Sequence, residues 1–335
     1  MHTLITGGAG YIGSHTCLAL LEAGHQVTVL DNLCNGSAVA LQRVQDLTGQ
    51  ALTFIHGDIR NPDDLRRAFA APIDAVIHFA ALKAVGESCE KPLDYFDNNI
   101  GGTIALLQAM RAAAVKTLVF SSSATVYGQP DAVPVTEDAP LRVTNPYGRT
   151  KLVMEELIGD CCQADPSMSA VLLRYFNPVG AHPSGRIGED PSGTPNNLMP
   201  YIAQVAVGRR QRLSVFGGDY PTVDGTGVRD YLHVMDLADA HVRALDYAAT
   251  ARGALALNVG TGQGCSVLEL VRAFEQASGQ PIAYEVVARR PGDVAALWAD
   301  PTRAMQVLGW SASRGIEAMC ADTWRWQRDN PKGYA

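Results

Sequence analysis

Short apolar runs alternate with longer amphipathic stretches over the first 176 residues. The apolar runs are near-continuous, which is typical of parallel strands covered on both faces, and they predict strands at 4–6, 27–30, 54–56, 75–79, 118–121 and 171–176. The amphipathic stretches predict helices at 12–23, 62–69, 101–114 and 146–162. Strands and helices in alternation imply βαβ units, so the pattern predicts an α/β fold with a Rossmann-type, doubly wound parallel sheet.

The pattern changes after Phe176. Residues 177–200 are rich in Pro, Gly, Ser and Asn and show little periodicity, so we interpret them as a long functional loop. Beyond it, shorter segments predict helices and strands at 201–208, 213–216, 236–249, 255–259, 267–277, 282–286 and 316–327. We therefore predict a larger domain over residues 1–176 and a smaller C-terminal α/β substrate-binding domain mainly over 177–335. Some later segments, such as 229–260, are expected to return to the first sheet.

Composition narrows the class of protein. Of 335 residues, 47% are hydrophobic and 18% are charged, which is ordinary for a soluble globular protein. The net charge of −7 argues against a nucleic-acid partner or an anionic membrane, because both require clustered positive charge. No apolar run is long enough for a membrane span and no signal-peptide pattern is visible, so we expect a cytoplasmic protein. The seven cysteines form no C-x-x-C pair, so we expect free thiols and no metal site.

A glycine-rich turn joins the first predicted strand to the first predicted helix. Gly7, Gly10 and Gly13 allow the backbone to approach a pyrophosphate closely, and the helix start aims its free N–H groups at the same place. Asp31 ends the second predicted strand, where a carboxylate can accept hydrogen bonds from the ribose hydroxyls of an adenosine. Because that carboxylate would repel a 2′-phosphate, the position favours NAD over NADP. Asp58 follows the third strand and is either an adenine contact or a turn residue.

Tyr147 and Lys151 form a second pattern with chemical meaning. Asn145 is suited to be an N-cap and Pro146 a first helical residue, so Tyr147 and Lys151 share one face of the helix that follows. The ammonium, the helix N-terminus and a positive nicotinamide would each lower the pKa of Tyr147. The pair is then suited to take a proton from a sugar hydroxyl while hydride leaves the same carbon. Ser123, at the end of a strand, either hydrogen-bonds the reacting oxygen or is a polar turn residue.

These patterns belong to longer strings that extend along essentially the whole chain. The strings are TGGAGYIGSHT at 6–16, LDNLCN at 30–35, GDIRN at 57–61, LKAVGES at 82–88, SSSATVYG at 121–128, LLRYFNPVGAHPSG at 172–185 and NNLMPYIAQVAVGRR at 196–210. In them the chain resembles the extended short-chain dehydrogenase/reductase superfamily and, more closely, the bacterial type of the UDP-glucose 4-epimerase family.

The resemblance implies two sets of ligand contacts. The NAD contacts fall on Gly7, Gly10, Tyr11, Ile12, Gly13, Asp31, Asn32, Asn35, Asp58, Ile59, Phe79, Ala80, Lys83, Asn98, Tyr147, Lys151 and Phe176. The UDP-sugar contacts fall on Lys83, Ser123, Tyr147, Asn177, Asn197, Leu198, Phe216, Arg229, Arg290, Asp293 and Leu297. Two arginines of the second set can neutralise a diphosphate through charge-assisted hydrogen bonds, although surface salt bridges are the alternative interpretation.

The resemblance also implies an activity. The family interconverts UDP-glucose and UDP-galactose in galactose metabolism, with NAD as cofactor and Tyr147, Lys151 and Ser123 as the catalytic residues. Hydride and proton leave C4 of the hexose, the 4-keto sugar turns within the pocket, and both return on the opposite face. Family members are commonly homodimers through a helix pair, which here would be the helix around 98–114 and the one after Tyr147.

Two other functions are left open by the sequence. A sugar-nucleotide 4,6-dehydratase of the same superfamily needs an acid/base pair, usually Asp-Glu, beside the serine. Here Ser123 is followed by Ala124 and Thr125. A non-catalytic NAD-binding regulator would keep the glycine-rich turn but need not keep Tyr147 and Lys151 together with two arginines.

Leu297 departs from the enteric members of the family, which have tyrosine at this position in the sugar pocket. Members that also accept N-acetylated sugars have a small residue there. Leucine is intermediate in size, so we predict partial activity on UDP-N-acetylglucosamine and UDP-N-acetylgalactosamine.

Overall fold

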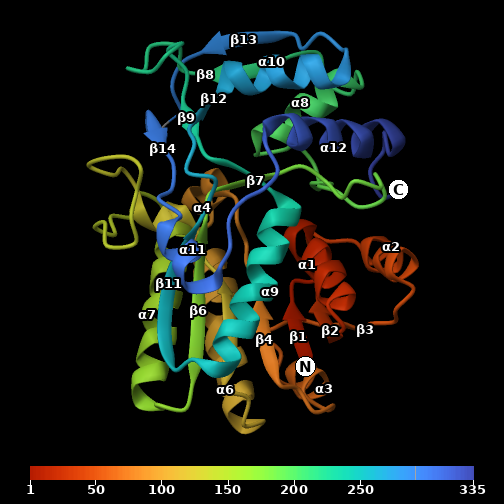
Figure 1. The fold of residues 1–335 in the computed structure, drawn as a ribbon, viewed down its shortest axis with the longest axis vertical. Coiled ribbons are helices and arrows are strands. Elements are labelled where there is room, and N and C mark those ends of the chain that lie inside the picture. Colours follow the sequence, from red (N-terminus) through yellow and green to blue (C-terminus); the bar gives the residue numbers. More distant parts are fainter. Residues whose placement is uncertain (291) are drawn as a thin grey trace.

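The computed structural model describes residues 1–290 and 292–335, and its centre is a seven-stranded parallel sheet (Figure 1). In spatial order its strands are β11 (Gly253–Val259), β6 (Ser169–Tyr175), β5 (Thr117–Ser121), β4 (Ala75–His78), β1 (His2–Thr6), β2 (Gln26–Asp31) and β3 (Thr53–His56). The strand order reverses between β1 and β4, and ligands of open α/β sheets bind in the crevice at such a point. The predicted doubly wound sheet is confirmed.

Neighbouring residues of each strand point into two different helical layers. Ile5 belongs to a buried cluster with side chains from α1 (Tyr11–Glu22), α2 (Ala38–Thr48), α9 (Val234–Thr250) and α11 (Thr302–Leu308). Leu4 belongs to a second cluster with side chains from α3 (Pro62–Ala68), α6 (Gly102–Ala112) and α7 (Pro146–Ala164). Successive residues of a strand point to opposite faces of the sheet, and here both faces are covered by helices. Odd and even positions of the strands are therefore both apolar, which explains the near-continuous apolar runs.

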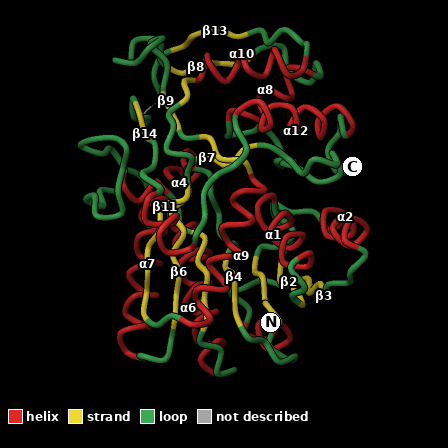
Figure 2. The backbone as a smooth tube through the Cα atoms, in the orientation of Figure 1, coloured by secondary structure: helices red, strands yellow, loops and turns green. Residues whose placement is uncertain are grey.

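The smaller half contains three short sheets, and its loops meet the carboxyl ends of the central strands (Figures 1 and 2). The sheets pair β7 (Asn177–Val179) with β10 (Tyr231–His233), β8 (Leu213–Phe216) with β13 (Tyr284–Val287), and β12 (Cys265–Ser266) with β9 (Val228–Arg229) and β14 (Ala296–Leu297). A separate core joins side chains of α8 (Leu198–Ala206), α10 (Val267–Ser278) and α12 (Ile316–Asp329). The carboxyl ends of the central strands therefore face the smaller half (Figures 1 and 2).

Several elements differ from the sequence prediction. The helix expected at 101–114 is preceded by α4 (Val85–Glu90), α5 (Pro92–Tyr95) and a π-helical turn, η1 (Phe96–Gly101), which runs directly into α6. No helix was expected at α2, where only three residues are buried and the apolar signal is short. The strand expected at 255–259 is part of β11, which pairs with β6 along seven residues at the edge of the central sheet. The division into domains at residue 176 stays a prediction.

Two further expectations concern the chain as a whole. Across the described residues, no helix has both the length and the apolar character to span a membrane. All seven cysteines are free thiols, and those at positions 17, 162 and 320 are buried.

Candidate active site

The glycine-rich turn between β1 and α1 packs tightly against the backbone of its neighbours. Gly7 has a φ of +74°, and a Cβ on it would lie 2.7 Å from the backbone nitrogen of Ala80. A Cβ on Gly13 would lie 2.3 Å from the carbonyl oxygen of Gly7. Around Gly10, by contrast, a Cβ would meet only that same carbonyl oxygen, at 3.4 Å. The chain itself thus constrains Gly10 less than Gly7 and Gly13, and close approach of a pyrophosphate would account for a glycine at this position.

Helix α1 begins at this turn and directs its N-terminus into it. Gly10 is the N-cap, and no side chain caps the first helical turn. The first N–H groups of a helix have no acceptor within it, so those of Tyr11, Ile12 and Gly13 are available to an anion. The hydroxyl of Tyr11 donates instead to the carbonyl oxygen of Gly180 at 2.7 Å. If Tyr11 and Ile12 contact NAD as predicted, they can do so through their backbone N–H groups.

Asp31 lies at the carboxyl end of β2, next to the glycine-rich turn. Its carboxylate accepts hydrogen bonds from the backbone nitrogens of Ala9 at 2.9 Å and Leu33 at 2.8 Å. Burial raises the pKa of this carboxyl, whereas the two backbone donors act in the opposite direction. Each oxygen keeps a lone pair, so Asp31 can still accept from ribose hydroxyls. The turn, the helix N-terminus and this carboxylate fit NAD.

The Asp58 side chain is already satisfied within the protein. Its carboxylate accepts from the Arg60 guanidinium, with a shortest distance of 2.8 Å, and from Asn32 Nδ2 at 3.0 Å. Hydrogen bonding to Arg60 holds the pKa of Asp58 well below its usual range. Ile59 is buried against the α3–α6–α7 layer of the sheet. Asp58 thus organises its turn, and the adenine contacts of Asp58 and Ile59 stay predictions.

Helix α7 brings Tyr147 and Lys151 together as predicted. Asn145 is the N-cap, and its side-chain oxygen accepts from the backbone nitrogen of Gly148 at 2.8 Å. Tyr147 is 7% exposed and Lys151 is 2% exposed, so both are held inside the fold. The Lys151 ammonium lies 6.0 Å from the centre of the Tyr147 ring and donates to the carbonyl oxygen of Ser121 at 2.7 Å.

The direction of the pKa shift at Tyr147 corrects one expectation. Burial is the largest influence and raises the pKa of the phenol, while a hydrogen bond with Ser123 acts to lower it. Burial also lowers the pKa of Lys151 to about 7. The expected lowering of the Tyr147 pKa is therefore wrong for the chain taken by itself, because desolvation of the charged form exceeds the local favourable contacts. The contribution of a nicotinamide charge belongs to the proposal below.

Three consecutive serines lie at the carboxyl end of β5, of which Ser121 is the last residue of the strand, and each makes a different contact. Ser121 hydrogen-bonds the hydroxyl of Tyr175 at 2.8 Å, and Ser122 donates to the buried carboxylate of Glu155. Ser123 caps the short 3₁₀-helix η2 (Ala124–Tyr127), where its oxygen accepts from the backbone nitrogen of Thr125 at 3.2 Å. Since the Ser123 hydroxyl also interacts with Tyr147, its turn role and its expected catalytic role are compatible.

Asn99 is a buried residue that supports the candidate site and that the sequence did not single out. It is fully buried in the π-helical turn, and its side chain bonds both backbone groups of Leu82, at 2.8 and 3.0 Å. It also donates to the hydroxyl of Thr150 on α7 at 2.9 Å, while its neighbour Asn98 donates to it at 2.9 Å. Asn99 thereby ties the loop after β4 to the catalytic helix. In the sequence, only the pair Asn98–Asn99 could have drawn attention to it. In the structure, the π-helical turn is the signal, because such turns are frequent at functional sites.

The segment 180–197 contacts residues of both predicted sets of ligand contacts. Its Glu189 lies 3.6 Å from the Lys83 ammonium and accepts from Asn197 Nδ2 at 2.9 Å. Ser192 donates to Asn35 in the loop after β2 at 3.1 Å. The structure thus brings two predicted NAD contacts, Lys83 and Asn35, against the same loop. Glu189 was not singled out by the sequence, because its partners are distant in the chain.

The other predicted NAD contacts lie at the ends of β4 and β6. Phe79 and Ala80 both donate backbone N–H groups to the carbonyl oxygen of Thr6, which fixes their loop against β1. Phe79 also packs on the ring of His241, with 4.7 Å between ring centres. Phe176 directly follows β6 and is buried in a small cluster beside η2.

Apart from Lys83, Ser123 and Tyr147, the predicted substrate contacts lie on the smaller half and are partly or largely exposed, and we call these residues the rim. Arg290 lies 5.5 Å above the Phe216 ring and donates to Asp293 at 2.9 Å, so these three residues are together. Arg229 on β9 is paired in register with Leu297 on β14, which makes a second group. The remaining contacts begin elements of the smaller half: Asn177 starts β7, Asn197 is the N-cap of α8 and Leu198 its first residue.

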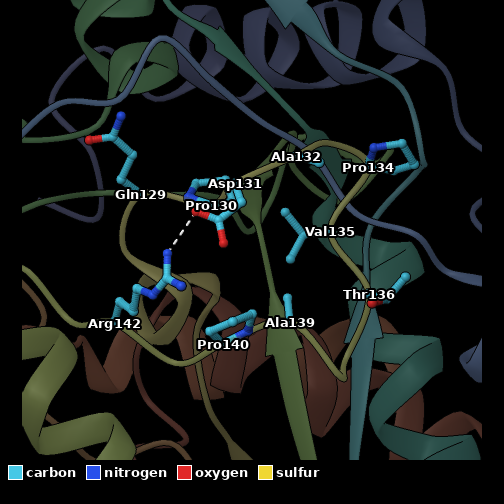
Figure 3. Close-up of a pocket in the computed structure, with 10 residues that line it drawn as sticks. All are labelled: Gln129, Pro130, Asp131, Ala132, Pro134, Val135, Thr136, Ala139, Pro140 and Arg142. Carbon is cyan, nitrogen blue, oxygen red and sulfur yellow. Dashed lines mark hydrogen bonds and ion pairs between the residues drawn. The ribbon is translucent and has the colours of Figure 1, made fainter.

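A surface pocket of about 190 Å³ lies beneath the segment 129–142 (Figure 3). Its charged lining residues, Asp131 and Arg142, are paired with each other at 2.7 Å. None of the residues predicted to bind a ligand lines this pocket. The candidate site is therefore the group of residues at the carboxyl ends of the central strands that the side-chain contacts above bring together.

Comparison with known sequences gives likenesses over the full length. The family model described as GDP-mannose 4,6 dehydratase matches residues 4–323. A UDP-glucose 4-epimerase of Bacillus subtilis is 59% identical over 335 residues, which cover 100% of this chain and 99% of that protein. The UDP-glucose 4-epimerase of Bos taurus is 58% identical over 339 residues, which cover 99% of this chain and 97% of that protein.

Solved structures give the same result. The UDP-glucose 4-epimerase of Bifidobacterium longum in complex with NAD⁺ and UDP has a TM-score of 0.97 at 51% identity, covering 99% of this chain and 100% of that one. The enzyme of Stenotrophomonas maltophila with bound NAD and formylated UDP-arabinopyranose has a TM-score of 0.97 at 53% identity, covering 99% of each chain. The glycine-rich turn, the Tyr147–Lys151 pair and these full-length likenesses agree, and the chain belongs to the UDP-glucose 4-epimerase family.

Proposed function

We propose that this protein interconverts UDP-glucose and UDP-galactose, with NAD as its resident cofactor. The observation that carries the proposal is the buried cluster of Tyr147, Lys151 and Ser123, which lies on the same edge of the sheet as the glycine-rich turn. Relatives and structural neighbours of the same name, some of them with NAD and UDP bound, support it.

In this proposal, the residues around the glycine-rich turn bind NAD. The N–H groups at the start of α1 would hold the pyrophosphate, and Asp31 would accept from the adenosine ribose. Lys151 would contact the nicotinamide ribose from the floor of the site. The other positions of the NAD set, from Asn32 to Phe176, line the same carboxyl edge and belong to this proposal. When bound there, NAD supplies the hydride acceptor, and later the hydride donor, for C4 of the hexose.

The catalytic residues move the proton. Tyr147, as the phenolate, accepts the proton of the 4-hydroxyl and returns it after the 4-keto sugar has turned. Ser123 hydrogen-bonds the same sugar oxygen and keeps it close to Tyr147. The Lys151 ammonium stabilises the phenolate, and the positive nicotinamide adds to this effect, which together oppose the burial that raises the pKa of Tyr147.

The rim supplies recognition of the UDP-sugar. Arg229 and Arg290 would neutralise the diphosphate, and Phe216 would contact the uridine. Leu297 would face the hexose, where its size leaves more room than a tyrosine. Of the rival functions, a 4,6-dehydratase is disfavoured because Ser123 is followed by Ala124 and by Thr125, whose hydroxyl donates to Ser123 at 3.0 Å. Neither side chain carries the carboxylic acid that elimination requires.

The proposal also covers the oligomeric state and the location of the protein. We expect a homodimer built through α6 and α7, which both pack on η1 and cover the same face of the sheet. We also expect the protein to work in the cytoplasm, where UDP-sugars and a reducing environment for its free thiols occur together.

The test is incubation of the purified protein with UDP-galactose and no added NAD, followed by chromatographic analysis of the nucleotide sugars. We expect UDP-glucose to accumulate until the two sugars are at equilibrium, because the reaction returns its hydride and consumes no NAD. A 4-keto-6-deoxy sugar as the product would instead identify a dehydratase. No conversion by protein that contains NAD would refute the proposed activity.

A further inference from the structure

A buried ion pair lies directly behind the catalytic residues and has no part in the mechanism above. Glu155 is on α7, one helical turn after Lys151, and Arg174 is on β6. Each is only 5% exposed. The guanidinium donates to both carboxylate oxygens, with a shortest distance of 2.6 Å.

The Glu155 carboxylate is also bonded to the serine triplet. The hydroxyl of Ser122 donates to Glu155 Oε1. Ser122 lies between Ser121, whose carbonyl oxygen accepts from Lys151, and Ser123, which interacts with Tyr147. A single carboxylate is therefore connected to the backbone that carries both the lysine acceptor and the catalytic serine.

Arg174 holds this carboxylate in place from the other side. Its remaining donors reach the hydroxyl of Tyr127 at 3.1 Å and the carbonyl oxygen of Glu137 at 3.2 Å. Tyr127 in turn donates to Asn258 on β11 at 2.6 Å. Because every charged group of the pair is hydrogen-bonded, the Glu155 carboxylate has one defined position.

A buried ion pair gives little net stability, because desolvation of both charges offsets their attraction. The negative charge of Glu155 also acts on Lys151, which lies one turn earlier on the same helix. Around the Lys151 ammonium lie the Phe120 ring at 4.9 Å, the Tyr147 ring and the neutral His78 on β4. The positive Arg174 on β6 is paired with Glu155 itself. Glu155 is the charge that opposes the effect of burial on the Lys151 ammonium.

We propose that Glu155 is a positioning residue, whose carboxylate, fixed by Arg174 and Ser122, keeps Lys151 protonated and holds the serine triplet in register with Tyr147. This inference rests on the proposed function only in that Lys151 and Ser123 act in catalysis. The charge effect on Lys151 itself is independent of any activity.

The chain allows a direct measurement, because it contains only five lysines: Lys83, Lys91, Lys116, Lys151 and Lys332. Labelling lysine with ¹³C at Cε gives five NMR signals, and K151R identifies that of Lys151. We expect E155Q to lower the titration midpoint of Lys151 by about one pH unit or more, the size of shift that a nearby opposite charge causes. The matched control is E156Q, which removes the same charge from the next, exposed position and should leave the midpoint unchanged.

If E155Q does not fold, because it leaves Arg174 unpaired, the double variant E155Q/R174M carries the test without an unpaired buried charge. A downward displacement of the Lys151 midpoint is again expected, but a smaller one than in E155Q, because R174M also removes a positive charge. A midpoint equal to that of the wild type in the folded variant would overturn the inference.

Turnover gives the second readout. We expect the alkaline decline of kcat to move to lower pH in E155Q, with the KM for UDP-galactose unchanged. A loss of kcat by one factor at every pH would show a purely structural role and also overturn the inference. The NMR titration decides the role of Glu155 and wild-type turnover decides the proposed function, so failure of one is distinguishable from failure of the other.

Discussion

Two parts of the candidate site differ in burial: the floor, which consists of Ser123, Tyr147 and Lys151, and the rim on the smaller half. On the floor, Tyr147 and Lys151 are almost fully buried, and Lys151 is hydrogen-bonded within the fold. On the rim, Phe216 is 43% exposed and the Arg290 side chain is 52% exposed. Arg290 has a partner in Asp293, but exposed ion pairs of this kind contribute little stability.

The difference in burial suggests that the floor carries out the reaction and that the rim binds the substrate. Groups held in a buried environment keep their geometry during a reaction and interact strongly, because little water screens them. Arginines at an exposed rim can exchange an internal carboxylate for a diphosphate at small cost. Substitutions on the floor should therefore reduce the rate of chemistry, and those on the rim should reduce affinity.

The largest effect is expected at Tyr147. Y147F keeps the ring that packs on the floor and removes the proton acceptor, so kcat should fall by about 10²- to 10⁴-fold. NAD content and the affinity for UDP should change little, which absorbance of the released cofactor and calorimetry with UDP would check. Turnover close to that of the wild type would contradict the role assigned to Tyr147.

At the rim, R290A should raise the KM for UDP-galactose by about 10- to 100-fold, the value of one or two charge-assisted hydrogen bonds. The kcat at saturation should change much less, and steady-state kinetics separates the two constants. Arg289 offers a matched control, because it pairs with Asp219 at 2.7 Å and stacks on Tyr220. If R289A and R290A raise KM equally, the diphosphate contact of Arg290 is wrong.

Leu297 tests whether the rim also sets the choice of sugar. Because leucine is smaller than tyrosine, we expect measurable turnover of UDP-N-acetylglucosamine beside that of UDP-glucose. L297Y should lower kcat/KM for the acetylated sugar by about tenfold, since a lost or blocked pocket contact has effects of this size. Side-by-side kcat/KM values for both sugars give the answer, and no detectable turnover of the acetylated sugar by the wild type would exclude the idea.

The last prediction concerns stability in acid and not turnover. Burial lowers the pKa values of His15 and His78 to about 3 and that of His241 to about 4, and all three belong to the sheet half. Between these values and about 6.5, the unfolded chain binds more protons than the folded one. The free energy of unfolding should therefore fall as the pH is lowered through this window, by at most about 1.4 kcal/mol per pH unit for each histidine.

Thermal unfolding between pH 7 and pH 5 would measure this effect. H241Q should unfold at a lower temperature at pH 7 but lose less stability on acidification. An unchanged dependence on pH would show that His241 is not kept neutral by the fold.

The sequence allowed the floor to be predicted better than the rim or its support. The Asn145 cap and the Tyr147–Lys151 spacing are local signals on one helix, and both are confirmed as structure. The contacts of Asn99 with Thr150 and of Glu155 with Arg174 join separate elements, so no local pattern announces them. For the chain without cofactor, the expected lowering of the Tyr147 pKa was wrong, because the extent of burial is a tertiary property.

The position of β11 has a consequence for synthesis of the protein on the ribosome. Until residues beyond 259 have emerged, β6 has an unpaired edge and α1 lacks the helix α9 that packs on it. Exposed strand edges and uncovered apolar helix faces are what draws nascent chains into aggregates. We therefore expect that a fragment ending near residue 176, although it contains six of the seven strands, is insoluble without a chaperone.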